Sequence, residues 1–477
     1  MKTTLHNLIR LPTQQSQRGL LIRVLLCLVA TQFGASARAA DIFVDANAAA
    51  GGDGSAALPY VRITDAVGRA RQLRQGGAIR LRERIMIHVA AGNYVGTFNP
   101  NPLDNNGNKE VLPILLNVPN LTLAGATVLD HDALGLPTGP SNGPQSKLSP
   151  SNSTDGEHQA LVLICRTADG SVGNGVTVTG FTFDAAGSIA VLVDRVANFA
   201  VLDNAFLHAN FGTITRLSSG IVDGNFYFNC IGVGPGIGGG SRNSPARVTL
   251  SGNRSTGATG GADIRGEPSL RSLDLGANTL QLEPLQLVYD RNNPADLANL
   301  PDALDVSVQG NDFSGNAYTG LWCFFYSFNP LFGYTTKDAS QPKTAVVRAT
   351  ITGNTFTDNG DYGFVVEAGG AFRNNPRQLT AAFSGVFTDN ALQDNGRAGA
   401  LFDFIIGDVS LGSASIQTYK YLEQSAYQVT DMEGELAGFD YDNPATDPLS
   451  GAILNNSLTV NGATIPPGIK ITSLKNK

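Results

Sequence analysis

An asparagine that recurs at the end of short β-rich segments constrains the fold of this 477-residue chain more than any other feature. In each segment, alternating residues lead through Gly or Asp to the aligned position, with first intervals of 23, 21 and 28 residues. Later intervals of 58, 43 and 36 residues contain insertions rich in Gly, Pro and Asn. Such self-similarity is typical of a solenoid, in which each repeat forms one turn. The aligned segments are Val176–Phe183, Ala200–Phe206, Gly220–Phe226, Val248–Asn253, Val306–Phe313, Ala349–Phe356 and Gly385–Leu392.

A second asparagine follows within most copies and precedes a Gly and a new apolar run. Asparagine suits such corners because it tolerates the left-handed backbone region and its amide bonds nearby backbone groups. Stacked corner amides can also bond one another, so the two columns predict ladders that satisfy buried polar groups. The second column comprises Asn210, Asn229, Asn316, Asn359 and Asn395.

The period of the apolar residues favours strands over helices. It is 2 rather than 3.6, and β-branched residues fill the runs. An antiparallel sandwich has turns every 8 to 12 residues, but it has no reason to repeat one Asn column about every 22 residues. The sequence therefore predicts an all-β, parallel solenoid of about 9–12 turns.

The N-terminal part of the chain carries a more specific pattern. It comprises a short strand ending at Asp45, a turn at Gly51–Gly54, Pro59, an Ala-containing helix from Ile63, and a strand leading to Gly92-Asn-Tyr94. This segment, residues 41–96, resembles the N-terminal segment of a bacterial β-helix family of unknown function. The whole chain resembles secreted right-handed parallel β-helix proteins of the pectin-lyase-like superfold. The resemblance implies a single-stranded, right-handed parallel β-helix with an N-terminal helical cap.

The predicted cap is a helix over 63–73, with Thr64 as its N-cap and a buried stripe of Ala66, Val67 and Ala70. A terminal element is needed because the first turn of a solenoid would otherwise expose its core. We expect 41–96 to form this cap and the first strands, 97–418 the β-helix with long loop insertions, and 419–477 a C-terminal cap.

Residues 1–40 have the features of a bacterial Sec-type signal peptide. Basic residues precede the short apolar run Val24–Ala30, and Ala37-Arg38-Ala39 fits a cleavage site. We therefore predict a secreted or periplasmic protein, without stable membrane insertion because the apolar run is too short to span a bilayer.

Charge narrows the range of partners. The chain has 33 Lys and Arg against 40 Asp and Glu, and removal of the leader takes away five basic groups, leaving a net charge of about −12. Because this excess of negative charge would repel a phosphate backbone, we expect that the protein does not bind nucleic acid. Cys165, Cys230 and Cys323 are widely spaced, which favours buried apolar side chains over disulfides or a metal site. We expect a monomer.

Two carboxylates are the best catalytic candidates. Aligning the corner at Asn359 with that at Asn395 places Glu367 beside Asp403 in the next turn. Like charges about 4.8 Å apart disfavour double ionisation, so the pair would share a proton or hold a cation. Stacked carboxylates in related folds bind Ca²⁺ or act as acid and base, so Ca²⁺ is a candidate cofactor. Arg397 is a third candidate catalytic group, and a solvated acidic column is the alternative interpretation.

An aromatic run offers a surface for sugar rings. Between Leu321 and Tyr334 lie seven aromatic residues, including the only Trp of the chain. Exposed aromatic planes pack against the C–H faces of sugars, whereas a buried strand would use the same residues in the core. The substrate-binding candidates are Trp322, Phe325 and Tyr326, with Arg373 and Arg377 to clamp a substrate carboxylate.

These features together predict a protein that binds a polysaccharide, expected to be acidic, and cleaves it by lyase or hydrolase chemistry. The alternatives are a non-catalytic carbohydrate-binding surface protein and a purely structural spacer.

Overall fold

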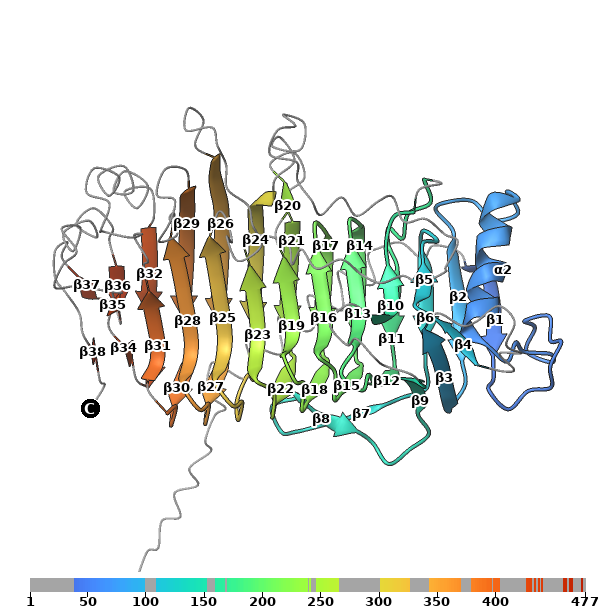
Figure 1. The fold of residues 1–477 in the computed structure, drawn as a ribbon, viewed down its shortest axis with the longest axis horizontal. Helices are drawn as coiled ribbons and strands as arrows, with labels where there is room; N and C mark the ends of the chain where they lie inside the picture. The colour runs from blue at the N-terminus through green and yellow to red at the C-terminus, as the bar shows by residue number, and fades with distance from the viewer. Residues whose placement is uncertain are drawn as a thin grey trace, which may run out of the picture.

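The computed structural model describes residues 38–403, with gaps at 99–108, 152–158, 168–169, 239, 242–245, 266–300, 327–342, 370–378 and 397, together with short strands between 426 and 474. Parallel strands lie side by side along the long axis of the molecule, and helix α2 (Ile63–Gln75) lies at the N-terminal end (Figure 1).

Three parallel sheets, here called A, B and C, are built from successive turns of the chain, as the sequence predicts. One turn runs from a sheet A strand through the asparagine corner to a short sheet B strand and then to a sheet C strand. Sheet A contains β1 (Arg38–Val44), β2 (Arg84–Val89), β6 (Leu121–Ala124), β11 (Thr177–Thr179), β14 (Ala197–Leu202), β17 (Ser219–Asp223), β21 (Ala246–Ser251), β24 (Pro301–Gln309), β26 (Lys343–Thr352), β29 (Leu379–Thr388), β32 (Ala426–Thr430) and β36 (Leu458–Val460). Two further strands of this sheet are antiparallel to their neighbours, β20 (Gly240–Ser241) beside β24 and β37 (Ala463–Ile465) beside β36.

Sheets B and C complete the turns, and their members are as follows. Sheet B contains β4 (Glu110–Leu112), β3 (Gly92–Phe98), β9 (Ser146–Pro150), β12 (Phe181–Asp184), β15 (Ala205–Leu207), β18 (Phe226–Phe228) and β22 (Arg254–Thr256), followed by a separately paired part, β27 (Thr355–Thr357), β30 (Ala391–Gln393) and β33 (Glu433–Gly434). Sheet C contains β5 (Ile114–Leu116), β10 (Ala160–Ile164), β13 (Ile189–Asp194), β16 (Phe211–Arg216), β19 (Val233–Gly238), β23 (Gly260–Arg265), β25 (Thr319–Tyr326), β28 (Tyr362–Gly369), β31 (Ala398–Asp403) and β35 (Phe439–Asp440). Two antiparallel pairs lie outside these sheets, β7 (Leu129–His131) with β8 (Pro137–Pro140), and β34 (Leu436–Ala437) with β38 (Ser473–Leu474).

The core fills the space between the three sheets. Aromatic side chains from successive sheet B strands stack inside it, with ring centroids of Phe183 and Phe206 at 5.2 Å and of Phe206 and Tyr227 at 4.8 Å. Cys165, Cys230 and Cys323 are free and buried, which confirms the expectation for these residues. Burial raises the pKa of all three thiols, so they stay protonated at neutral pH.

The first asparagine column forms the predicted ladder. Asn253 accepts from the backbone N–H and the Nδ2 of Asn225 at 3.0 Å each, and its own Nδ2 donates to Val222 O and to Asn311 Oδ1, both at 2.9 Å. The pattern runs from Asn204 to Asn390, and these side chains are buried. Residues with positive φ, such as Gly252 at 60°, precede the ladder positions and turn the chain.

The second column is shorter than predicted. Asn316, Asn359 and Asn395 form a ladder with Nδ2 to Oδ1 distances of 3.1 and 3.0 Å. The prediction is wrong for Asn210 and Asn229. Their turns place small residues at this buried corner, Ala209 and Cys230, at the same distance after the first-column asparagine as Asn316 in its turn. Asn210 comes one residue after the corner, and Asn229 one residue before it.

Helix α2 packs its buried side, which includes Ile63, Ala66, Val67 and Ala70, onto the first strands. The expected N-cap at Thr64 is wrong, because the N-cap is Arg62, whose side chain makes no capping bond. The buried Glu110, from the start of β4, caps the helix instead. Its carboxyl group accepts hydrogen bonds from the N–H of Ile63 at 2.6 Å, from the N–H of Thr64 at 2.9 Å and from Thr64 Oγ1 at 2.6 Å.

The β7–β8 hairpin lies against sheet B (Figure 1). Leu129 packs with Ala205 and Phe226. Arg254 of β22 bonds to the hairpin as well. The Arg254 Nη2 lies 2.5 Å from Asp132 Oδ2 in the hairpin, while its Nε lies 2.9 Å from Asp312 Oδ2. One guanidinium therefore bridges two carboxylates from distant parts of the chain.

We expect Arg254→Ala to loosen this hairpin and to lower the free energy of unfolding by about 2 kcal/mol, because two partly buried carboxylates lose their shared cation. Although burial raises the pKa of Asp132, hydrogen bonds from Leu136, Arg254 and Leu134 give a net lowering below the usual 3.8. The stability from this contact is therefore present above that pH and is lost as the pH falls. Limited proteolysis at residues 132–137, against Arg247→Ala as an exposed control, measures the loosening; equal resistance of both variants would contradict it.

Two boundaries bear on the predicted domains. Strand β1 begins at Arg38, so the last residues of the predicted leader pair with β2. Parallel pairing in sheet A continues past residue 418 into β32 and β36. Within the described ranges, no helix is both long and apolar enough to cross a membrane.

Candidate functional site

One register column of sheet C contains both predicted carboxylates. Glu367 of β28 is the Cα partner of Asp403 in β31, which in turn pairs with Asp440 of β35. On the other side of β28, Glu367 pairs with Phe324 of β25, and Phe324 pairs with Arg265 of β23. We call these five positions the Glu367 column. It joins the predicted carboxylate pair to the aromatic strand, which the sequence presents as separate features.

The neighbouring columns show which side of β25 belongs to the core. Leu321 and Cys323 are fully buried in the main core cluster, and strand alternation puts Trp322 on the opposite, outer side of sheet C. Trp322 is partly exposed and pairs in register with Asp263, which is 5% exposed. The single Trp of the chain therefore lies outside the core.

The remaining candidates are located only in part. Phe325 and Tyr326 are the last residues of β25, paired in register with Ala368 and Gly369 of β28. Arg373, Arg377 and Arg397 lie outside the described residues.

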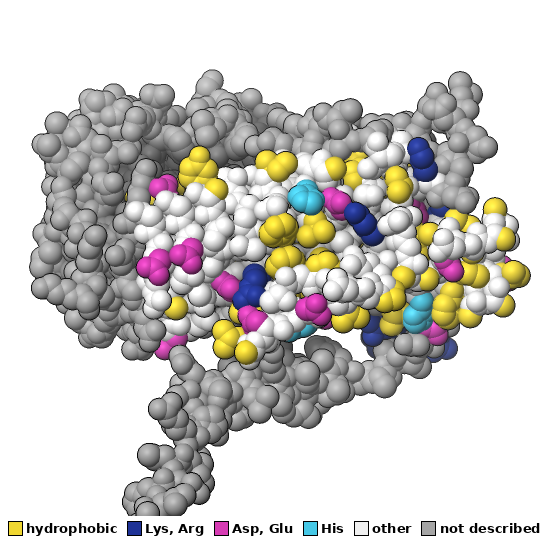
Figure 2. Space-filling model, turned by 90° about the horizontal axis from the view of Figure 1, so that it is seen from below, with side chains coloured by type: hydrophobic (Ala, Val, Ile, Leu, Met, Phe, Trp, Pro, Cys, Tyr) yellow, Lys and Arg dark blue, Asp and Glu magenta, His cyan; other side chains and the backbone are white. Residues whose placement is uncertain are grey.

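Sheet B carries a charged row that the sequence analysis missed. Asp184 binds Lys147 Nζ at 2.8 Å through Oδ2 and His208 Nδ1 at 3.1 Å through Oδ1. Burial raises the pKa of Asp184, but the bonds from Lys147 and His208 outweigh it, so the net pKa is lowered. Figure 2 shows hydrophobic side chains gathered beside basic, acidic and His groups on this side of the molecule. Phe228, the last residue of β18, is 38% exposed, and Ile231, which follows that strand, is 64% exposed.

A second missed group lies at the corner between sheets A and B. The pKa of Asp203 is raised, first by desolvation and then by the negative charge of Asp223, while His131 of the hairpin opposes the shift. Ser251 Oγ donates to Asp223 Oδ1 at 2.7 Å. The sequence holds a weak signal for it, because both aspartates lie within two residues of an aligned asparagine.

In the part of the chain that the structure describes, no three His, Cys, Asp or Glu residues are arranged to hold a metal ion.

Comparisons with known proteins give similarity of shape alone. No protein-family model matches the chain, and no curated protein matches its sequence. The A-module of mannuronan C-5 epimerase AlgE4 from Azotobacter vinelandii is 13% identical, with a TM-score of 0.36, over 87% of this chain and 94% of that one. A glycoside hydrolase is 8% identical, with a TM-score of 0.37, over 88% and 96%. PfbA, a surface adhesin of Streptococcus pneumoniae, is 9% identical, with a TM-score of 0.36, over 80% and 89%. The assignment of a parallel β-helix rests on the sheet order and register of this chain itself.

Proposed function

We propose that the protein binds an acidic polysaccharide along the outer face of sheet C and cleaves it at Glu367 and Asp403. The observation that supports this is the Glu367 column, in which an arginine position, an aromatic position and successive carboxylate positions follow one another across adjacent strands. Parallel strands lie about 4.8 Å apart, so a glycan running across the strands would meet these positions in turn.

In this proposal one of the two carboxyl groups is the base and the other is the acid. Two acids at adjacent positions do not both ionise readily, so one is a carboxylate base while its partner keeps a proton. In a lyase, the base removes the C5 proton of a uronate, the C4–C5 double bond forms as the C4–O bond breaks, and the acid protonates the leaving oxygen. In a hydrolase, the same pair activates water and protonates the glycosidic oxygen.

The other groups bind the substrate in this proposal. Trp322, Phe325 and Tyr326 supply aromatic surface for sugar rings. Arg373 and Arg377 pair with substrate carboxylates, and Arg397 takes part in the catalytic step. In the alternative arrangement the acidic positions hold Ca²⁺ instead of sharing a proton, and the cation offsets the repulsion between an anionic glycan and a chain of net charge −7.

We also infer a mature protein that is exported by the leader 1–40, is monomeric and has a right-handed coil closed by α2. The burial of one side of α2 against the first strands supports the closure. Mass determination of the N-terminus after expression in a bacterium with an intact leader tests the export.

The test of function is a panel of polyuronides and matched neutral glycans. We expect products that absorb in the ultraviolet from a lyase, or new reducing ends alone from a hydrolase. Glu367→Gln and Asp403→Asn should each lower the rate by about a hundredfold while glycan binding persists, because each removes acid–base chemistry and keeps the shape of the side chain. Glu433→Gln, in sheet B, is the matched control. Retention on immobilised glycan without any product would overturn cleavage and leave binding; the absence of both would overturn the proposal.

A further inference from the structure

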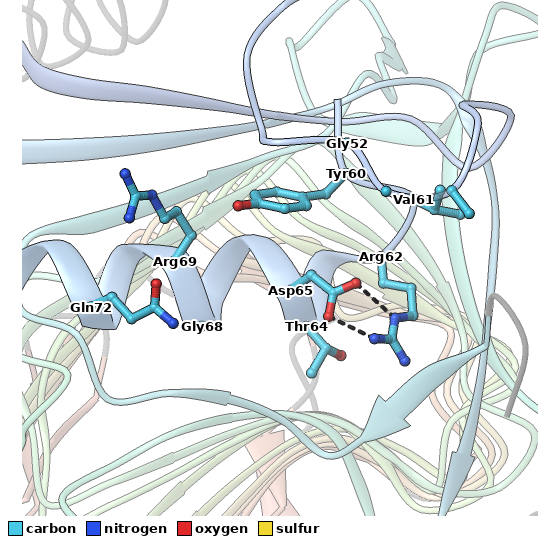
Figure 3. A pocket seen from close by; sticks show the side chains of 11 residues that line it. Gly52, Tyr60, Val61, Arg62, Thr64, Asp65, Gly68, Arg69 and Gln72 are labelled. Carbon is cyan, nitrogen blue, oxygen red and sulfur yellow. Dashed lines mark hydrogen bonds and ion pairs between the residues drawn. The ribbon is translucent and has the colours of Figure 1, made fainter. Parts of the chain in front are cut away.

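A polar pocket lies at the N-terminal end of the molecule, away from the Glu367 column. It is an open pocket of about 490 Å³ between the loop that precedes α2 and one side of the helix. This volume is within the range of small-molecule sites. Figure 3 shows the ring of Tyr60 above the helix, between the side chains of Arg69 and Asp65.

The charges in the pocket leave one cation available. Arg62 and Asp65 neutralise each other through two hydrogen bonds, of 2.8 Å to Oδ2 and 2.7 Å to Oδ1. Arg69 is exposed and makes no hydrogen bond or ion pair with any residue in the described ranges, although its charge contributes to lowering the pKa of Asp53. The side chains that line the pocket therefore carry one net positive charge on a chain that is acidic as a whole, with the carboxylates of Asp53 and Glu110 close enough to interact with Arg69 and Arg62 respectively.

A glycine in the middle of the helix keeps the pocket open. Glycine destabilises a helix interior relative to alanine, so a packing reason for it is expected. At Gly68, however, a Cβ would meet no atom within 4 Å. No neighbour therefore demands a glycine there, and any larger side chain at position 68 would project into the pocket that it lines. In the opposite wall a glycine is required by packing, because a Cβ on Gly52 would lie 2.0 Å from Pro59 O.

We propose that this pocket binds one acidic sugar residue, a hexuronate. The guanidinium of Arg69 pairs with the carboxylate, the Tyr60 ring packs against the C–H face of the sugar, and the exposed Gln72 bonds to hydroxyl groups. A neutral sugar would lack the ionic contact. The proposal stands independently of the function assigned to sheet C, since it shares no residue with the Glu367 column.

Isothermal titration with digalacturonate and α-1,4-galactobiose tests the pocket, because these two disaccharides share one linkage and differ only at C6, which carries a carboxylate in the first and a hydroxymethyl group in the second. We expect digalacturonate to bind at least tenfold more tightly than galactobiose. Arg69→Gln should remove most of that difference, and Arg247→Gln, an exposed arginine of β21, should leave it unchanged.

Gly68→Leu separates a blocked pocket from a damaged fold. Leucine favours helix over glycine, so this variant should melt no lower than the wild type while losing the affinity for digalacturonate. Glu367→Gln should leave intact the affinity for digalacturonate that Gly68→Leu removes. This result would distinguish binding in the α2 pocket from binding on sheet C. Equal affinity for the two disaccharides, or affinity unchanged by both Arg69→Gln and Gly68→Leu, would overturn the proposal.

Discussion

Replacing Asn253 with Ala is expected to lower the free energy of unfolding by about 4 kcal/mol, because it breaks the ladder at its centre. The substitution removes four hydrogen bonds, two accepted from Asn225 and two donated, to Val222 O and Asn311 Oδ1. The side chain is 0% exposed, so water cannot replace these partners without opening the corner. Urea unfolding monitored by circular dichroism measures the loss.

Asn93→Ala is the control for this experiment. Asn93 is exposed in β3, and we expect a change within about 0.5 kcal/mol. Hydrogen exchange adds a local readout, since the backbone amide of Asn225 loses its acceptor, Asn253 Oδ1, and should exchange faster in Asn253→Ala. A loss below about 1 kcal/mol would show that the ladder contributes less than its buried hydrogen bonds imply.

Glu110→Ala should destabilise the protein by about 3 kcal/mol and unfold the first turn of α2. The buried carboxyl is the acceptor for two helix N–H groups and the Thr64 hydroxyl, and alanine leaves all three without it. Thermal unfolding measures the total loss, and hydrogen exchange at Ile63 and Thr64 shows whether the helix start is its source. Thr97→Ala, on the exposed side of β3, is a control that should have little effect.

The same carboxyl gives a pH dependence of defined sign. Burial raises the pKa of Glu110 above its usual 4.5, against the opposing hydrogen bonds from Thr64 and Ile63. The folded protein therefore holds this proton more tightly than the unfolded chain does. The resulting stability is complete below pH 4.5 and is lost as the pH rises through the folded pKa. Between about pH 4 and pH 8 the stability of Glu110→Gln should lack this change. Parallel curves of unfolding free energy against pH for the wild type and this variant would contradict the assignment.

Local patterns in the sequence predict most of the architecture. Alternation with a period of 2 places Val306 and Val308 in the core. The asparagine corner can be recognised from the sequence, because the amide of each asparagine bonds the equivalent asparagine of the next turn, regardless of the length of the loop between them. The offsets of Asn210 and Asn229 by one residue from the buried corner escaped the alignment, because an asparagine beside the corner also suits a turn, as at Asn229 with its positive φ.

Less of the candidate site could be predicted from the sequence. Alignment of two similar turns, 36 residues apart, correctly places Glu367 opposite Asp403. The position of Phe324 beside Glu367 was hidden, because an insertion separates β25 from β28 and its length does not reveal the register.

The amino-acid pattern alone thus specified strands, corners and a stacked solenoid, since these depend on residues close in sequence or one repeat apart. Tertiary structure decided the rest. Glu110 lies 47 residues from the helix end that it caps, Arg254 lies 122 residues from the Asp132 that it holds, and the α2 pocket exists only where a loop folds back over Gly68. Such contacts depend on how segments of irregular length return to the coil, and no repeat or periodicity encodes that return.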